Sequence, residues 1–444
     1  MLSFKKSLVK DSLMSMVAFS GQWGLAFLTF LFLLKILKVE EIGQWVIYMS
    51  FLTFIEVFRN GLVQNAYIFK AKNKLSERGR LNSTCLFLLV FASLIGYFML
   101  FIPGEWLSVL FKSPELNLLI LPCIIYLLIT SVVRIFEFGW ICDSRFDLLA
   151  VTRISYGISF LSLIVVFYLS NKLTLIILPY LQIISGFIAL IIVWLLSNKE
   201  RFLAIRIDEV ISVVKYGRFV AGTNLVSIIL NKSDIYIIGF LIGPGAVAIY
   251  NTASKMINII EIPLTSISQS QFSKISAAYQ DNNTLLTMRN IGLGIVMSSV
   301  VLLPIIIVVA VFSDSIINLI AGPEFSESAI VLRILAIFVF VKILGRFSGI
   351  TLDAIGKPNY NFYILLVTLG VNVILNFILI ENYGIYGIAY ATSISWLLGS
   401  LLSSLVLLKS SINIYQSINN ELISLKHKAL NYLTNKNHVF KIWN

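Results

Sequence analysis

Long apolar runs decide what this chain can fold into. Stretches of about 20 residues with few charges recur along the sequence, and a helix of that length crosses the hydrocarbon core of a bilayer. Backbone amides in hydrocarbon must be hydrogen-bonded within the structure, so the choice is helices or a closed barrel, and runs of this length favour helices. Composition agrees, since 58% of the residues are hydrophobic and 13% are charged, too few to coat a water-soluble globule. The sequence predicts an all-α polytopic membrane protein.

Apolar length, with polar residues and Pro or Gly as breaks, predicts about twelve transmembrane helices. The expected spans lie near residues 12–36, 42–67, 81–103, 116–141, 151–169, 174–196, 219–242, 246–272, 290–312, 329–352, 359–380 and 385–408. The outer loops between them are short, and the longest covers residues 313–328. No loop is long enough to form a catalytic domain, so an enzyme is not expected.

The charges of the loops predict the orientation of these spans, because cytoplasmic loops retain Lys and Arg. With a cytoplasmic N-terminus, the inner loops and both ends hold 23 of the 34 Lys and Arg residues, and the outer loops hold four. Both termini are therefore expected in the cytoplasm. The net charge of +12 is explained by this bias, and since no basic cluster lies on a soluble domain, nucleic acid is not expected as a partner.

The chain is expected to consist of two halves of six helices each. Two junctions about 205 residues apart, Leu37–Trp45 and Ile242–Tyr250, both place a tight turn, a small residue and then an aromatic residue at the same offsets. Between the halves, Ser197–Arg218 mixes basic and apolar residues, which is typical of an amphipathic helix on the inner membrane surface. We therefore expect six-helix bundles over residues 1–218, including this linker helix, and 219–408, then a basic cytoplasmic tail over 409–444.

Two segments carry a family resemblance. One is DIYIIGFLIGPGAVAIY at Asp234–Tyr250, and the other is Leu352–Leu397, with a Gly-Lys-Pro turn, the pair Asn372 and Asn376, and a run of small residues. Both resemble the polysaccharide transporter family within the multidrug/oligosaccharidyl-lipid/polysaccharide flippase superfamily. The resemblance implies a MATE-like flippase fold in the bacterial inner membrane, with O-antigen and capsule repeat-unit flippases as relatives. Lipid II flippases typically carry two extra C-terminal helices, and the tail here has no second long apolar run, which disfavours lipid II as substrate.

Twelve charged residues fall inside the expected spans, seven basic and five acidic. A charge at the centre of a bilayer costs roughly 2.5–3.5 kcal/mol on insertion scales, so such residues usually face a cavity or a partner. Helical spacing places them on polar stripes of five spans, which we expect to line a shared aqueous cavity. The candidates for substrate binding are Arg59, Arg134, Lys232, Lys255, Lys342 and Arg346.

Three acidic residues, Glu56, Asp234 and Glu261, are candidates for uptake of a coupling ion, H⁺ or Na⁺, and no other cofactor or metal is expected. Glu56 with Arg59, and Arg134 with Glu137, are also spaced as self-neutralised pairs that lock helices together, and both roles stay open. Lys255, Lys342 and Arg346 lack a nearby opposite charge within one or two turns, and Glu261 is the more isolated of the acids. This isolation favours substrate binding by Lys255, Lys342 and Arg346, and proton uptake by Glu261.

The basic excess favours an anionic substrate, since Arg and Lys bind phosphate oxygens through charge-assisted hydrogen bonds. Together with the resemblance, it predicts a transporter that moves a lipid-linked oligosaccharide of the undecaprenyl diphosphate type by alternating access, for O-antigen or capsule synthesis. Membrane lipids surround it, and a polysaccharide polymerase and assembly proteins are candidate partners. The alternative is a cation-coupled exporter of drugs or other small molecules with the same fold.

Overall fold

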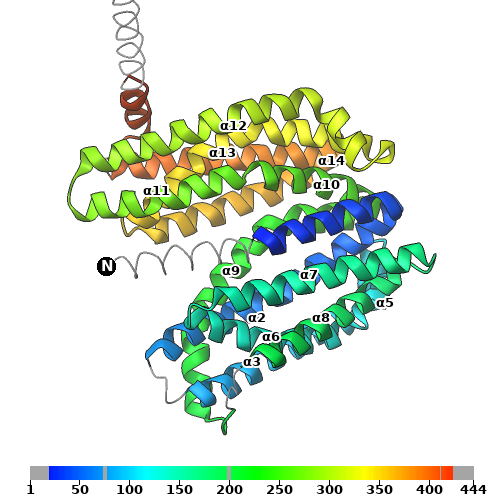
Figure 1. Ribbon diagram of the computed structural model, residues 1–444. Coiled ribbons are helices and arrows are strands. Elements are labelled where there is room, and N and C mark those ends of the chain that lie inside the picture. Colours follow the sequence, from blue (N-terminus) through cyan, green and yellow to red (C-terminus); the bar gives the residue numbers. More distant parts are fainter. Residues whose placement is uncertain (1–19, 74–77, 198–201, 411, 424–444) are drawn as a thin grey trace, which may run out of the picture. The chain divides into compact units, whose positions relative to one another are not determined.

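A computed structural model describes residues 20–73, 78–197, 202–410 and 412–423, and it is all-helical over these residues (Figure 1). The helices are Ser20–Ile36, α2 (Val39–Asn73), α3 (Arg78–Phe101), α4 (Gly104–Leu110), α5 (Leu116–Ile120), α6 (Cys123–Cys142), α7 (Phe146–Leu169), α8 (Leu178–Leu196), α9 (Ile207–Leu241), α10 (Pro244–Ile260), α11 (Ile262–Gln280), α12 (Thr284–Ile320), α13 (Ser326–Ala354) and α14 (Pro358–Lys409). Two short 3₁₀ helices, η2 (Leu175–Ile177) and η3 (Pro323–Phe325), precede α8 and α13.

Each of the expected spans overlaps a helix, apart from residues 12–19, which lie outside the described part of the chain. Nine helical segments in that part are long and apolar enough to cross a membrane. One of them is α14, whose 52 residues contain the last two expected spans, while Ser20–Ile36 is a shorter apolar helix. Large apolar side chains within the expected spans, such as Leu195, Val300 and Val311, are exposed, as expected for lipid contact. The protein is a multi-pass membrane protein of helical bundles.

Two long helices contain breaks where the sequence predicts a loop. In α14, Gly384 has φ +55° and ψ −135°, a backbone conformation that residues with a Cβ rarely adopt, and it separates the two expected spans. In α12, Phe312 is non-helical, but the helix continues to Ile320. The expected outer loop over residues 313–328 is therefore mostly helix.

The chain divides into two compact units, Met1–Ala248 and Ile249–Asn444. In unit 1, α2 packs along α9 and against α3 and α6. Part of its core consists of buried Val63, Ala66, Tyr67, Leu81, Cys85, Leu88, Leu89, Ile135, Phe138 and Val213. The division lies one expected span beyond the boundary that we predicted after residue 218.

The segment that we expected to form a separate linker helix is built differently. Residues 202–206 are not helical, and residues 207–218 are the first turns of α9. Val213 belongs to the core of unit 1, and a Cβ at Gly217 would collide with the carbonyl of Leu62 on α2. This close approach shows that the start of α9 packs against α2 rather than lying as an independent surface helix.

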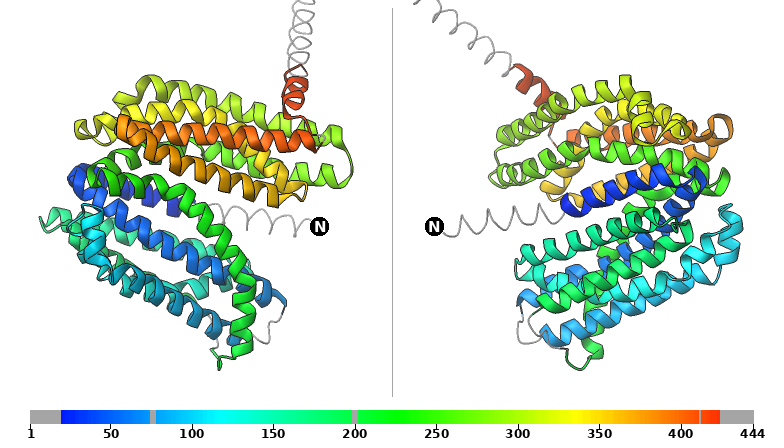
Figure 2. Two further views of the ribbon diagram at one scale, coloured as in Figure 1. Left: turned by 180° about the vertical axis from the view of Figure 1, so that it is seen from behind. Right: turned by 45° about the vertical axis from the view of Figure 1, so that its right-hand side comes forward.

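In unit 2, α13 lies between α12 and α14 and also contacts α11 (Figure 2). The backbone of Ser417, in a short helix over residues 414–423, packs closely against Gly292 of α12. This helix is the described part of the predicted tail, and residues 424–444 lie outside the described part. The central position of α13 places its polar residues next to those of α11 and α14.

Candidate functional site

Arg59 on α2 is fully buried and serves the packing of unit 1. Its guanidinium donates to Ser93 Oγ (2.9 Å), Leu127 O (2.7 Å), Ser131 Oγ (3.0 Å), Thr130 Oγ1 (2.8 Å) and Glu56 Oε1 (3.3 Å), which joins α2 to α3 and α6. The three hydroxyls donate to carbonyls of their own helices, so their lone pairs remain to accept from the guanidinium.

Of the two roles left open for the Glu56–Arg59 pair, the geometry fits the structural one. The expectation that Arg59 faces an aqueous cavity is wrong, because the side chain has no exposed surface. Glu56 remains partly exposed, so its assignment to ion coupling stays a prediction.

A cluster of three charges joins α6 to α7 in unit 1. The buried carboxylate of Glu137 accepts from Arg134 Nη1 at 2.6 Å and from Arg153 Nη2 at 3.0 Å and Nε at 3.3 Å. The side chains of Arg134 and Arg153 remain 19% and 12% exposed. The expected pair of Arg134 and Glu137 is therefore present, and Arg153 joins it as a third member. Two arginines thus share the Glu137 carboxylate, and Arg153 ties α7 to the pair within α6.

In unit 2, Lys342 on α13 lies between two partners from other helices. Its Nζ donates to Glu261 Oε1 at 2.6 Å and lies 4.2 Å from the centroid of the Trp396 ring on α14. Glu261 stands at the junction of α10 and α11. The expectations that Lys342 is unpaired and that Glu261 is isolated are both wrong, because the fold pairs residues that are 81 positions apart.

One turn further along α13, Arg346 is exposed, and its Nε donates to Ser268 Oγ on α11 at 3.2 Å. Among the described residues, this is the hydrogen bond that orients the guanidinium, and no carboxylate lies within salt-bridge distance of it. A guanidinium held by Nε keeps its Nη edge open, which is the edge that binds phosphate or carboxylate oxygens in a fork. Arg346 is therefore the basic residue of unit 2 best presented for an anion.

The remaining candidates lie on α9 and α10. Lys232 and Lys255 are half-buried, and Asp234 is buried. Their assignments to substrate binding and ion coupling stay predictions.

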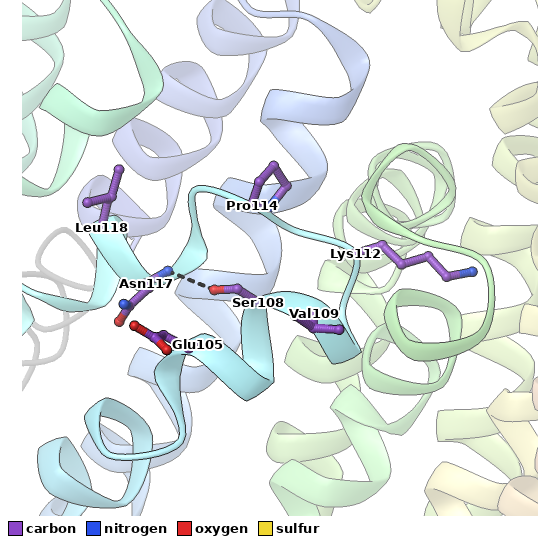
Figure 3. Close-up of a pocket in the computed structure, with 7 residues that line it drawn as sticks. All are labelled: Glu105, Ser108, Val109, Lys112, Pro114, Asn117 and Leu118. Atoms are coloured by element: carbon purple, nitrogen blue, oxygen red, sulfur yellow. Dashed lines mark hydrogen bonds between the residues drawn. The ribbon is translucent and has the colours of Figure 1, made fainter.

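A pocket of about 570 Å³ lies at one end of unit 1, where α4 and α5 meet (Figure 3). It is lined by Glu105, Ser108, Val109, Lys112, Pro114, Asn117 and Leu118, none of which we predicted as site residues. Lys112 extends away from Glu105 and Asn117, and its Nζ donates to the carbonyls of Leu241 and Ile242 at the end of α9. This lysine is thereby used to satisfy a helix terminus.

Sequence reasoning missed two side chains of these clusters, Arg153 and Trp396. Arg153 lies at the inner end of the expected span 151–169 and is among the 23 charges assigned to the inner side, whereas α7 begins at Phe146 and places Arg153 well within the helix. A signal was present, since α6 and α7 form a helical hairpin and residues at similar distances from its turn, such as Glu137 and Arg153, lie side by side. Trp396 carries no such signal, because an aromatic residue in an apolar span is ordinary.

A family model for polysaccharide biosynthesis proteins matches residues 32–330, more than half of the chain. The chain belongs to this family. Among curated proteins, it is similar to the "Probable low-salt glycan biosynthesis flippase Agl15" of Haloferax volcanii, with 26% identity over 191 residues that cover 43% of this chain and 40% of that protein. It is also 30% identical over 161 residues to the "Capsular polysaccharide biosynthesis protein CapF" of Staphylococcus aureus, which covers 35% of this chain and 39% of that protein. The chain thus spans about two-fifths of the length of these relatives.

Solved structures show the fold of this polysaccharide biosynthesis family member. A lipid II flippase MurJ in an inward closed conformation matches with a TM-score of 0.76 at 16% identity, over 94% of this chain and 92% of that one. An inward-facing MATE family multidrug resistance transporter matches with a TM-score of 0.74 at 12% identity, over 88% and 96% of the two chains. The predicted MATE-like fold is confirmed.

Proposed function

We propose that this polysaccharide biosynthesis family member is a flippase, which moves a prenyl-diphosphate-linked oligosaccharide across a membrane by alternating access. The observation that carries the proposal is Arg346 in unit 2, whose guanidinium is exposed and, among the described residues, has no carboxylate within salt-bridge distance. In unit 1 two arginines share Glu137, and in unit 2 Arg346 presents an open guanidinium edge. A diphosphate needs cationic partners away from bulk water, and these residues offer them.

The names of the relatives support the same proposal, since one is a probable flippase for glycan biosynthesis and another a capsular polysaccharide biosynthesis protein. We propose that the protein lies in a bacterial inner membrane, as the family resemblance implies, and that both termini are in the cytoplasm, as the bias of Lys and Arg in the loops implies. Membrane lipids, a polysaccharide polymerase and assembly proteins are the partners proposed. The coupling ion is H⁺ or Na⁺, with Glu56, Asp234 and Glu261 as the candidate acceptors.

A cation-coupled drug exporter of the same fold would need spare carboxylates to bind its substrates. The three carboxylates Glu56, Glu137 and Glu261 each bind a basic side chain. These three acids are thus already bound by basic side chains, while Arg346 stays open, which favours an anionic substrate over a cationic one.

The proposal is tested with the purified protein in liposomes that carry fluorescent prenyl-diphosphate-linked oligosaccharides. The rate at which the sugar becomes accessible to an added glycosidase reports translocation. We expect Arg346→Gln to slow this rate roughly tenfold or more, because a hydrogen bond to a charged group contributes about 1.5–3 kcal/mol. Arg346→Lys keeps the charge and loses the fork, so an intermediate rate is expected.

The matched control is Arg145→Gln, which removes an exposed arginine outside both clusters and should leave the rate unchanged. A wild-type rate in the Arg346→Gln protein would remove this residue from the binding site. If the wild-type protein itself does not accelerate translocation of any lipid-linked oligosaccharide, the proposed function is wrong.

A further inference from the structure

The carboxylate of Glu261 binds the ammonium group of Lys342 in the way that an anionic ligand would. The carboxylate accepts from Nζ at 2.6 Å, the distance of a strong charge-assisted hydrogen bond. Both side chains keep contact with the surroundings, Lys342 at 33% exposure and Glu261 at 16%. Arg59 in unit 1 shows the opposite arrangement, with no exposed surface at all. A ligand that reaches the Glu261 carboxylate can displace it from Lys342. A ligand cannot reach the groups that bind Arg59, so it cannot displace them.

The neighbourhood of Lys342 offers a second support for its charge. The Trp396 ring lies 4.2 Å from Nζ, within the range of a cation–π interaction. The ring belongs to α14 and the carboxylate to the start of α11, so the two supports come from different helices. Lys342 would keep the Trp396 contact if Glu261 moved away.

Glu261 lies where α10 ends and α11 begins. Pro263, two positions later, lacks the N–H that a continuous helix would need, so the Glu261 carboxylate lies at a break in the helical hydrogen bonding.

The other charges of the surrounding helices do not replace Glu261. The basic residues of α10, α11 and α12 are Lys255, Lys274 and Arg289, and the charged residues of α14 are Glu381 and Lys409. On α13 and α12, Arg333 is paired with Asp314, Glu327 is exposed, and Asp353 accepts from Asn361. Among the described residues of unit 2, Glu261 is thus the carboxylate within salt-bridge distance of Lys342.

We propose that Glu261 is an internal competitor of the substrate for Lys342. In this exchange, which rests on the proposed function, a phosphate oxygen of the substrate replaces the Glu261 carboxylate on Nζ, while Trp396 holds the lysine in place. The carboxylate then returns to Nζ and releases the phosphate. In the empty site the pair neutralises the charge of Lys342 and lowers the affinity for an anion, so that a charged product can leave.

The test measures binding of farnesyl diphosphate, a soluble prenyl diphosphate, to the purified full chain by calorimetry. Glu261→Gln removes the competitor, and we expect binding to tighten about tenfold, within the range of typical couplings between sites. Lys342→Gln should weaken binding, and the double variant should bind as Lys342→Gln does, because the effect of Glu261 acts through this lysine. Glu327→Gln, an exposed acid at the start of α13, is the matched control and should bind as the wild type does.

Unchanged or weaker binding by the Glu261→Gln protein would overturn the inference, as would the same tightening in the absence of Lys342. If Glu261→Gln does not give a folded protein, Glu261→Asp is used instead, because it keeps the charge on a shorter side chain. This variant should tighten binding by a smaller factor, and weaker binding would overturn the inference. If the wild-type protein neither binds farnesyl diphosphate nor translocates lipid-linked oligosaccharides, the proposed function fails first. Binding and translocation by the wild type without the effect of Glu261 would refute this exchange alone.

Discussion

Glu137 and Arg134 are partners in one ion pair, yet their removal should have very different effects on stability. Glu137→Gln leaves both Arg134 and Arg153 without their carboxylate, in a part of unit 1 where these side chains are 19% and 12% exposed. Removing one partner of a buried ion pair costs about 3–5 kcal/mol, and the partial exposure of the arginines places the expected cost near the lower end, about 3 kcal/mol. Arg134→Gln instead leaves a balanced pair, Glu137 with Arg153, so its cost should be about 1 kcal/mol, that of one net hydrogen bond.

Thermal unfolding in detergent measures this difference, with a thiol-reactive dye as probe. Cys85 and Cys123 are buried and become reactive when unit 1 unfolds. We expect the midpoint for Glu137→Gln to fall by about 6 °C or more, since 1 kcal/mol shifts the midpoint of a domain of this size by about 2–4 °C. The double variant Glu137→Gln, Arg134→Gln should be more stable than Glu137→Gln alone. Equal losses for the two single variants would refute the assignment of one carboxylate to two arginines.

Two further predictions concern packing and topology. Gly217→Leu should destabilise unit 1 by about 1–3 kcal/mol through overpacking, because any Cβ there meets the carbonyl of Leu62. The same dye assay measures this loss, and Gly222→Leu is the control, because a Cβ at Gly222 meets nothing within 4 Å. A cysteine at Asn382 should react with an impermeant maleimide in intact cells, and one at Asn283 should not, in a background free of the three native cysteines. The reverse labelling would overturn the orientation proposed from the loop charges.

The spans were predictable because the signal for them is local. Apolar length is a property of consecutive residues, and even the boundary between the last two spans coincides with a single residue, Gly384. Ion pairs within one helix were visible for the same reason, as Arg134 and Glu137 lie three positions apart. The start of α9 was misassigned because its basic residues suggested the membrane surface, whereas the close contact of Gly217 with α2 depends on the partner helix.

The contacts between helices could not be predicted in this way. Nothing within two turns of Lys342 is acidic, so the sequence suggested an unpaired lysine until the fold placed Glu261 beside it. Arg59 was misjudged for a related reason. Its acceptors are hydroxyls and a carbonyl on α3 and α6, and single serines and threonines in apolar spans give no indication that they converge on one guanidinium.

The arrangement of charges in the two units bears on two requirements that the proposed transport of an anion would impose. An unpaired cation within the bilayer is costly, so a site made of free lysines and arginines would destabilise the empty protein. A cation fully bound by its own carboxylate could not bind substrate. In unit 1 two arginines share Glu137, and in unit 2 Lys342 is held by a reachable Glu261 beside the exposed Arg346, so most of these cations are paired while one stays open to a ligand. For the proposed diphosphate substrate, the position of an open cation such as Arg346 therefore matters more than the total number of basic residues.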